Sequence, residues 1–257
     1  MDNVEEYLLK KQDLLAKKEH KKLKHLEDIF HHKKSGTYLE DIIFGSIDGV
    51  ITTFAVVAGA FGATFPLKVA FILGLANVFA DGISIAVGDF LAIRAEKDYQ
   101  KGQRIKEEWE IDNLKPIQEY ELTEIYRKKG FKGEDLKKIV NTIMSDKKIW
   151  VDEMMKDELN ISENSLGNPA KHGFMTFISF VVSGIIPLIP FILQLPLKET
   201  ILMSMSFTAI TLFVTGALKS LVLPLNWFKS GIEMLLVGSI AATIAYFVGD
   251  VIKQLII

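Results

Sequence analysis

An aspartate stands inside an apolar stretch that is long enough to cross a membrane. Asp48 lies in the segment IIFGSIDGVITTFAVVAGAFGA, residues 42–63, and is its one charged residue. A carboxylate at bilayer depth is expensive unless it is paired, hydrated or bound to a cation, so it indicates a functional site. The structural alternative is a polar turn, in which Asp48 caps a neighbouring helix while Gly49 allows close packing.

A second apolar segment, residues 69–93, also carries polar and acidic side chains. Asp81 lies four residues after Asn77, and Ser84 is close to the same helical face. Oxygen atoms of such groups are the ligands that hard divalent cations prefer. Two acidic membrane segments in one small protein predict a cation pathway, and we assign to it Asp48, Asp81, Asn77 and Ser84. The alternative for Asp81 is helix packing through the small residue beside it.

Between residues 94 and 171 the chain is highly charged and predicts a series of short helices. Glu107 and Glu110 share a face at i, i+3, and Met154 and Glu158 share one at i, i+4, with Met155 adjoining. Carboxylates favour hard or borderline divalent cations, and thioether sulfur shifts the preference toward softer transition metals. The pattern fits a carboxylate metal site. On spacing alone, solvated helix faces with methionines in the core explain it too.

The elements that must position these side chains are membrane helices. The chain has 257 residues, 49% of them hydrophobic and 24% charged, and the charge is concentrated in two regions. Five apolar blocks reach the ~20 residues that a spanning helix needs; they lie at residues 42–63, 69–93, 172–194, 199–222 and 229–256. The prediction is an all-α membrane protein with five transmembrane helices and a cytoplasmic helical insert between helices 2 and 3. Its parts are residues 1–41, an N-terminal segment; 42–93, helices 1 and 2; 94–171, the insert; and 172–257, helices 3 to 5.

Charge and cysteine content exclude several functions and predict an orientation. A net charge of −2 carries no basic signature for nucleic acid, and the absence of cysteine removes disulfides and thiolate metal sites. Lysine-rich stretches at residues 1–41 and 94–171 place both regions, and the N-terminus, in the cytoplasm. Residues 3–31 predict a basic amphipathic helix on an anionic membrane surface. Four histidines of the N-terminal segment could bind metal, but we expect them to be solvated; they are His20, His25, His31 and His32.

Two stretches are specific when taken together, FGSIDG in the first span and WVDEMMKDEL in the insert. With them the chain resembles, from about Tyr38 to the C-terminus, the vacuolar iron transporter family of iron and manganese exporters. The resemblance implies a homodimer with five membrane helices in each subunit. This dimer would move Fe²⁺ or Mn²⁺ out of the cytosol in exchange for protons. It implies no enzymatic activity and no permanently bound cofactor, because the metal is the substrate. The implied partners are the lipid bilayer, divalent metal ions, protons and a second copy of the chain.

The resemblance also assigns residues. Asp48 matches the family's membrane-embedded metal and proton site. The family's cytoplasmic metal ligands match Glu107, Glu110, Glu121, Met154, Met155 and Glu158. A family glutamate is here Gln118, with Glu119 beside it as a further candidate ligand. Where members of the family have a glutamate and a methionine in helix 2, this chain has Asn77 and Ile85. Helix 2 therefore offers oxygen ligands only, which favours Mn²⁺ over a softer ion.

Exchange follows from the chemistry of the two membrane aspartates. Asp48 and Asp81 can each hold a proton or a share of a cation, so metal loading expels protons. Two alternatives stay open, a membrane metal sensor that does not transport and a membrane oxidase with a carboxylate metal cluster. Against the oxidase, the insert lacks the paired E-x-x-H motifs of di-iron bundles. The expected location is a prokaryotic plasma membrane, or the vacuolar membrane if the source is eukaryotic.

Overall fold

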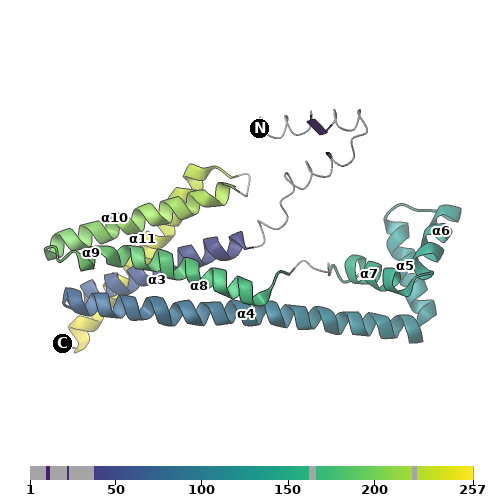
Figure 1. The fold of residues 1–257 in the computed structure, drawn as a ribbon, viewed down its shortest axis with the longest axis horizontal. Coiled ribbons are helices and arrows are strands. Elements are labelled where there is room, and N and C mark those ends of the chain that lie inside the picture. Colours follow the sequence, from purple (N-terminus) through teal and green to yellow (C-terminus); the bar gives the residue numbers. More distant parts are fainter. Residues whose placement is uncertain (1–9, 12–21, 23–37, 162–165, 222–224, 257) are drawn as a thin grey trace. The chain divides into compact units, whose positions relative to one another are not determined.

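The computed structural model describes residues 10–11, 22, 38–161, 166–221 and 225–256, and the regular elements within these ranges are all helices. The predicted amphipathic helix at residues 3–31 lies outside the described residues, apart from three lysines, and so do its four histidines. The helices (Figure 1) are α3 (Leu39–Gly62), α4 (Leu67–Asn113), α5 (Lys115–Lys128), α6 (Gly133–Met144), α7 (Lys147–Asp157), α8 (Pro169–Ile185), α9 (Ile189–Ile192), α10 (Leu197–Leu218) and α11 (Trp227–Ile256), with 3-10 turns at Ile186–Leu188 and Lys219–Leu221.

Five helical segments are long and apolar enough to cross a membrane, which confirms the predicted all-α fold with five spans. They are Leu39–Gly62, Leu67–Asn113, Pro169–Ile192, Leu197–Leu218 and Trp227–Leu255. The third segment joins α8, a 3-10 turn and α9. Pro187 and Pro190 each stand in the first turn of a short helix. Proline is tolerated there because the missing N–H has no intrahelical partner to lose.

α4 joins a membrane span to a long polar extension without a break. Its 47 residues extend about 70 Å at a rise of about 1.5 Å per residue, more than twice the thickness of the hydrocarbon core. The apolar run ends at Ile93, and charged residues recur from Arg94 onward. The acidic residues near the end of α4 are therefore outside the membrane.

The chain divides into two compact units, residues 1–82 with 175–257, and residues 83–174. We call these the membrane unit and the helical unit. The membrane unit contains α3, the first part of α4, most of α8, and α9 to α11. The helical unit contains the rest of α4, then α5, α6, α7 and the start of α8. The predicted insert, residues 94–171, falls within the helical unit.

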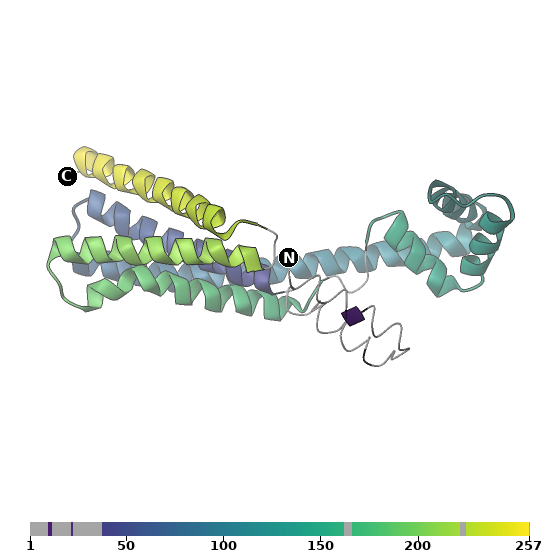
Figure 2. The same cartoon turned by 90° about the horizontal axis from the view of Figure 1, so that it is seen from above.

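In the membrane unit, glycines let α3 approach its neighbours closely. α3 lies alongside α10 and α11 (Figure 2). A Cβ at Gly49 would overlap the carbonyl oxygen of Phe180 on α8, and one at Gly62 would overlap that of Tyr246 on α11. Lipid tails are as apolar as leucine, so membrane helices associate through close packing of small residues. Because glycine has no side chain, Gly49 and Gly62 allow α3 to contact the backbones of α8 and α11 directly.

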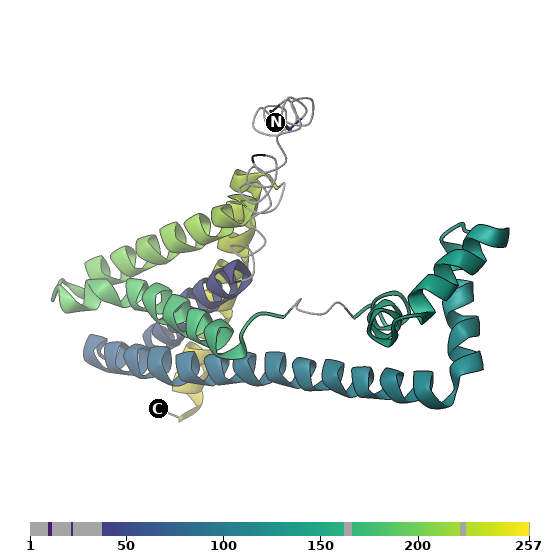
Figure 3. The ribbon, with the colours of Figure 1, turned by 45° about the vertical axis from the view of Figure 1, so that its right-hand side comes forward.

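The helical unit has an apolar core of its own, formed where α5, α6 and α7 gather beside the end of α4 (Figure 3). Leu122 of α5 and Trp150 and Met154 of α7 are at most 2% exposed. α6 contributes a helical stripe that consists of Leu136, Val140 and Ile143. Asp146 caps the N-terminus of α7, and its side chain accepts hydrogen bonds from the backbone N–H groups of Lys148 and Ile149. This core places the start of α7 firmly against α4.

Gly62→Ala will destabilise the protein by about 1–3 kcal/mol, the usual cost of overpacking, because the new methyl group meets the backbone of α11. Gly88→Ala on α4 is the matched control, since nothing lies within 4 Å of the added atom. The midpoint of thermal unfolding is measured on detergent-purified protein by size-exclusion chromatography after heating. Equal midpoints for the two variants would contradict the close contact of α3 with α11.

Candidate functional site

Four glutamates from three segments of the helical unit act on one another. Glu107 and Glu110 lie on α4, Glu121 lies on α5, and Glu158 follows the last residue of α7. The charges of Glu158, Glu110 and Glu121 all act on Glu107, and those of Glu121 and Glu110 act on Glu158. Residues that are distant in the sequence, from Glu107 to Glu158, thus form one acidic group. We call these four residues the carboxylate group.

Glu107 is the most deeply placed member of the carboxylate group. Its side chain is 1% exposed, and its Oε2 atom has no hydrogen-bond partner among the described residues. Burial, reinforced by the negative charges of Glu158 and Glu110, raises the pKa of Glu107 to about 7. Burial also raises the pKa of Glu158, with Glu121 as the next cause. Near neutral pH Glu107 can therefore hold a proton or give it up to a cation.

Gln118 links two members of the carboxylate group. This residue is 2% exposed, and its Nε2 atom donates to Glu110 Oε2 at 3.1 Å and to Glu121 Oε2 at 3.0 Å. Its Oε1 atom has no hydrogen-bond partner within the described part of the chain. The amide thus holds the carboxylates of α4 and α5 together without adding a charge. The sequence signalled it only as a polar residue at a position where the resembled family has glutamate.

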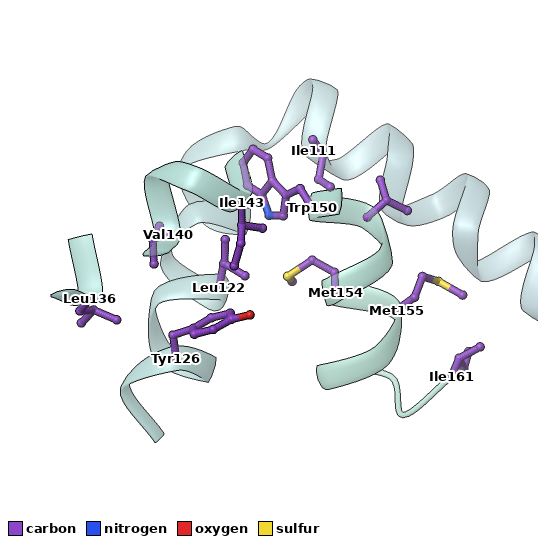
Figure 4. Packing of buried hydrophobic residues seen from close by; sticks show 11 residues of the cluster. Ile111, Leu122, Tyr126, Leu136, Val140, Ile143, Trp150, Met154, Met155 and Ile161 are labelled. Carbon is purple, nitrogen blue, oxygen red and sulfur yellow. The ribbon is translucent and has the colours of Figure 1, made fainter. Parts of the chain in front are cut away.

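The two methionines of α7 lie differently. Met154 is fully buried and extends toward Leu122, whereas Met155 extends to the opposite side, toward Ile161 (Figure 4). Glu119, the remaining candidate in the insert, is exposed. Within the described ranges no three acidic or histidine side chains converge closely enough to hold a metal ion as they are placed. The structure thus brings the four glutamates within electrostatic reach of one another, buries Met154 in the apolar core and leaves Glu119 on the surface.

The membrane aspartates lie on α3 and α4. Asp48 is partly buried, its backbone carbonyl accepts a hydrogen bond from Thr52 Oγ1 at 2.8 Å, and the charge of Asp81 acts on it. Asn77 is partly buried, and its Nδ2 atom has no hydrogen-bond partner among the described residues. Ser84 is exposed and belongs to the helical unit. Asp48, Asp81 and Asn77 thus contribute polar groups to the membrane unit.

Asp41 is a further acidic residue of α3 that the sequence reasoning missed. It is 8% exposed although it stands in the first helical turn. Ser179 Oγ on α8 lies 3.3 Å from its backbone carbonyl oxygen and donates to it. Asp41 precedes Asp48 by seven residues, two helical turns, so both lie on one side of α3. The seven-residue spacing could have indicated Asp41 in the sequence. A charged residue at the edge of an apolar stretch is common, however, and does not by itself indicate a functional site.

Glu107→Gln will stabilise the metal-free protein at about pH 8 by about 1–3 kcal/mol, since one pKa unit corresponds to about 1.4 kcal/mol. At pH values between 4.5, the ordinary pKa of glutamate, and about 7, the pKa of Glu107 in the folded protein, the folded chain keeps a proton on Glu107 that the unfolded chain has lost. Stability therefore falls as the pH rises through this range.

The measurement is the thermal unfolding midpoint in chelator, followed by tryptophan emission, whose shift on unfolding comes mainly from buried Trp150 because Trp109 and Trp227 are already exposed. Near pH 5 the variant and the wild type should agree, because glutamine and protonated glutamate are both neutral. Glu134→Gln, at a residue whose side chain is 78% exposed, serves as the control at both pH values. A variant less stable than wild type at pH 8 would show that the charge of Glu107 is compensated in the folded state.

Comparison with known proteins gives a consistent result over most of the chain. A model described as the VIT family matches residues 39–250. A "Vacuolar iron transporter" of Toxoplasma gondii is 34% identical over 235 residues, 88% of this chain and 78% of that protein. One of Plasmodium berghei is 33% identical over 239 residues, with 90% and 86% covered. A "Vacuolar iron transporter 1" of Arabidopsis thaliana is 28% identical over 223 residues, with 87% and 89% covered. The chain therefore belongs to the VIT family.

Proposed function

We propose that this protein is a membrane transporter, and no enzyme, that moves Fe²⁺ or Mn²⁺ out of the cytosol in exchange for protons. The observation that carries the proposal is the carboxylate group, in which the charges of three other glutamates act on buried Glu107. Groups of this composition suit borderline divalent cations. The names of the VIT relatives support iron as one substrate.

The helical unit collects the metal in this proposal. Glu107, Glu110, Glu121 and Glu158 supply oxygen ligands, and Met154 and Met155 are the sulfur candidates. Because no three acidic side chains of the described residues converge tightly as placed, the carboxylates close around the ion when it binds. Repulsion among them favours this step, since a divalent cation relieves the cost that raises the pKa of Glu107. Met155 must turn from the Ile161 side to join, and exposed Glu119 captures cations at the periphery.

The membrane path uses the acidic residues of α3 and α4. Asp48 and Asp81 each carry a proton or share a cation, and Asn77 adds an amide oxygen. Buried Asp41, two turns before Asp48 on α3, extends the row of carboxylates toward the N-terminal end of the helix. Ser84 completes the predicted set. Metal and protons compete for the same oxygen atoms, so movement of one drives movement of the other.

The assembly and orientation of the transporter are part of the proposal. The N-terminus is cytoplasmic, because the lysine-rich stretches then share one side of the membrane. The chain works as a homodimer, as the resemblance implies. In keeping with this, the spanning part of α4 leaves large apolar side chains exposed, among them Ile72, Leu73 and Phe79. The membrane is a prokaryotic plasma membrane, or the vacuolar membrane in a eukaryote, in line with the names of the relatives.

Asp48→Asn will abolish metal flux, because an amide can neither bind and release a proton nor share a cation's charge. Purified protein is reconstituted in proteoliposomes, Fe²⁺ and Mn²⁺ are offered in turn, and a pH dye reports on the opposite compartment. Asp250→Asn is the control, since this acid lies near the end of α11 and its carboxylate accepts a hydrogen bond from Gln254 at 2.9 Å. Metal binding by wild type without flux would contradict transport and favour a sensor.

Mn²⁺ affinity of the full-length protein will fall by about tenfold between pH 8 and pH 6, as one proton with a pKa of about 7 competes with the metal. Glu107→Gln will weaken binding and flatten this pH dependence, since the competing proton is gone. Isothermal titration calorimetry in detergent measures both effects, with Glu134→Gln as the control. An equally steep pH dependence in Glu107→Gln would place the competing proton on another residue.

A further inference from the structure

A basic cavity lies in the helical unit, on α4, before the carboxylate group. Its volume is about 200 Å³, and Lys97, Lys101 and Arg104 line it on the α4 side. Met155 and Ile161 form part of its apolar wall, on the side of α7 away from Leu122 (Figure 4). α4 thus presents a positive cavity one to two turns from an acidic group.

The three cations are not compensated alike. Arg104 is fixed by Asp152, at 2.7 Å from Nη1 to Oδ1, and by Glu108, at 3.3 Å from Nε to Oε1. Lys97 and Lys101 have no ion pair or hydrogen bond within the described part of the chain. They stand one helical turn apart, a spacing at which like charges repel. An anion between the two ammonium groups would remove that repulsion.

Nearby acidic side chains on α4 are engaged elsewhere. Glu96 Oε1 accepts a hydrogen bond from Gln100 at 3.0 Å, and Asp98 pairs with Arg94 at 3.9 Å. Both pairs are solvent-exposed. Neither acid is among the residues that line the cavity, so within the described part of the chain Lys97 and Lys101 supply its unpaired positive charge.

The position of the two lysines along α4 matches the polar layer of a membrane. The apolar run ends at Ile93, and Lys97 and Lys101 follow it by about 6 and 12 Å at the helical rise per residue. Headgroups occupy about 5–8 Å on each side of the hydrocarbon core. Lys97 is therefore at headgroup depth and Lys101 just beyond it. Basic cavities at this depth suit phosphate-bearing headgroups.

The size of the cavity agrees with that chemistry. A water molecule takes about 30 Å³ in the liquid, so about 200 Å³ accommodates roughly six atoms of that size. A phosphate group has five heavy atoms and therefore fits, and Met155 and Ile161 offer apolar contacts to a carbon esterified to it.

We propose that this cavity binds a phosphate group, held by Lys97 and Lys101 with Arg104 at its end, and carried by an anionic phospholipid or by a soluble phosphate. The bound group contacts Met155 and lies beside the Arg104–Asp152 pair, so it braces α7 against α4. α7 carries Met154 and leads directly into Glu158. The proposal is independent of metal transport, because it rests on the cavity and its uncompensated lysines.

The test uses full-length protein in detergent and three probes. They are dioctanoyl phosphatidic acid, dioctanoyl phosphatidylcholine and sodium phosphate, and native mass spectrometry with competition measures binding. The variant is Lys97→Gln with Lys101→Gln. Its matched control is Lys128→Gln with Lys138→Gln, two exposed lysines of α5 and α6. Circular dichroism and the elution volume confirm that both double variants are folded.

We expect phosphatidic acid to bind the wild type and the control alike, and to bind the double variant about tenfold more weakly or worse, the loss of about one charge-assisted hydrogen bond. Competition by sodium phosphate at the same concentration would support the site with a soluble phosphate as its ligand. Binding that is unchanged in the double variant would overturn the proposal. Equal binding of phosphatidylcholine and phosphatidic acid, or no binding of any probe, would overturn it as well.

Discussion

The repulsion among carboxylates that have been withdrawn from water is the interaction on which the structure of this protein depends. A buried charge is stable only when a proton, a counter-ion or a set of hydrogen bonds compensates it. Glu107 has neither a cationic partner in contact nor a hydrogen bond on Oε2 among the described residues, and its pKa rises to about 7. The folded helical unit thus carries an electrostatic cost, which a proton on Glu107 removes below about pH 7.

The apolar core of the helical unit maintains this unfavourable arrangement. Trp150, Met154 and Leu122 are almost fully buried and fasten α7 and α5 together beside α4, so the glutamates on these helices cannot simply separate. Gln118 reinforces the arrangement, because its amide donates to carboxylates on two helices. Hydrophobic burial, which is non-directional, thus supports a directional polar site.

The sequence predicted the spans well, because a bilayer demands long apolar helices and the spacing of charge marks their ends. It also singled out Asp48, since a lone carboxylate stands out in an apolar stretch. It could not predict that Met154 and Met155 diverge or that Glu119 is exposed, because neighbouring residues on a helix point about 100° apart and tertiary packing decides which face is buried. Asp41 escaped notice for the same reason, since its burial depends on α8.

Along α4 a positively charged stretch is followed by a negatively charged one. Lys97 and Lys101 come first, then Arg104, and then Glu107 and Glu110. Arg104 lies between the two regions and is paired with Glu108 of α4 and Asp152 of α7. The cation that acts on Glu107 is Lys106, which pairs with Glu110 at 3.4 Å and lowers the pKa of Glu107, but burial and the neighbouring carboxylates outweigh it and the pKa is raised to about 7. The Arg104–Asp152 contact therefore joins α4 to α7 at the boundary between the basic and the acidic stretch of α4.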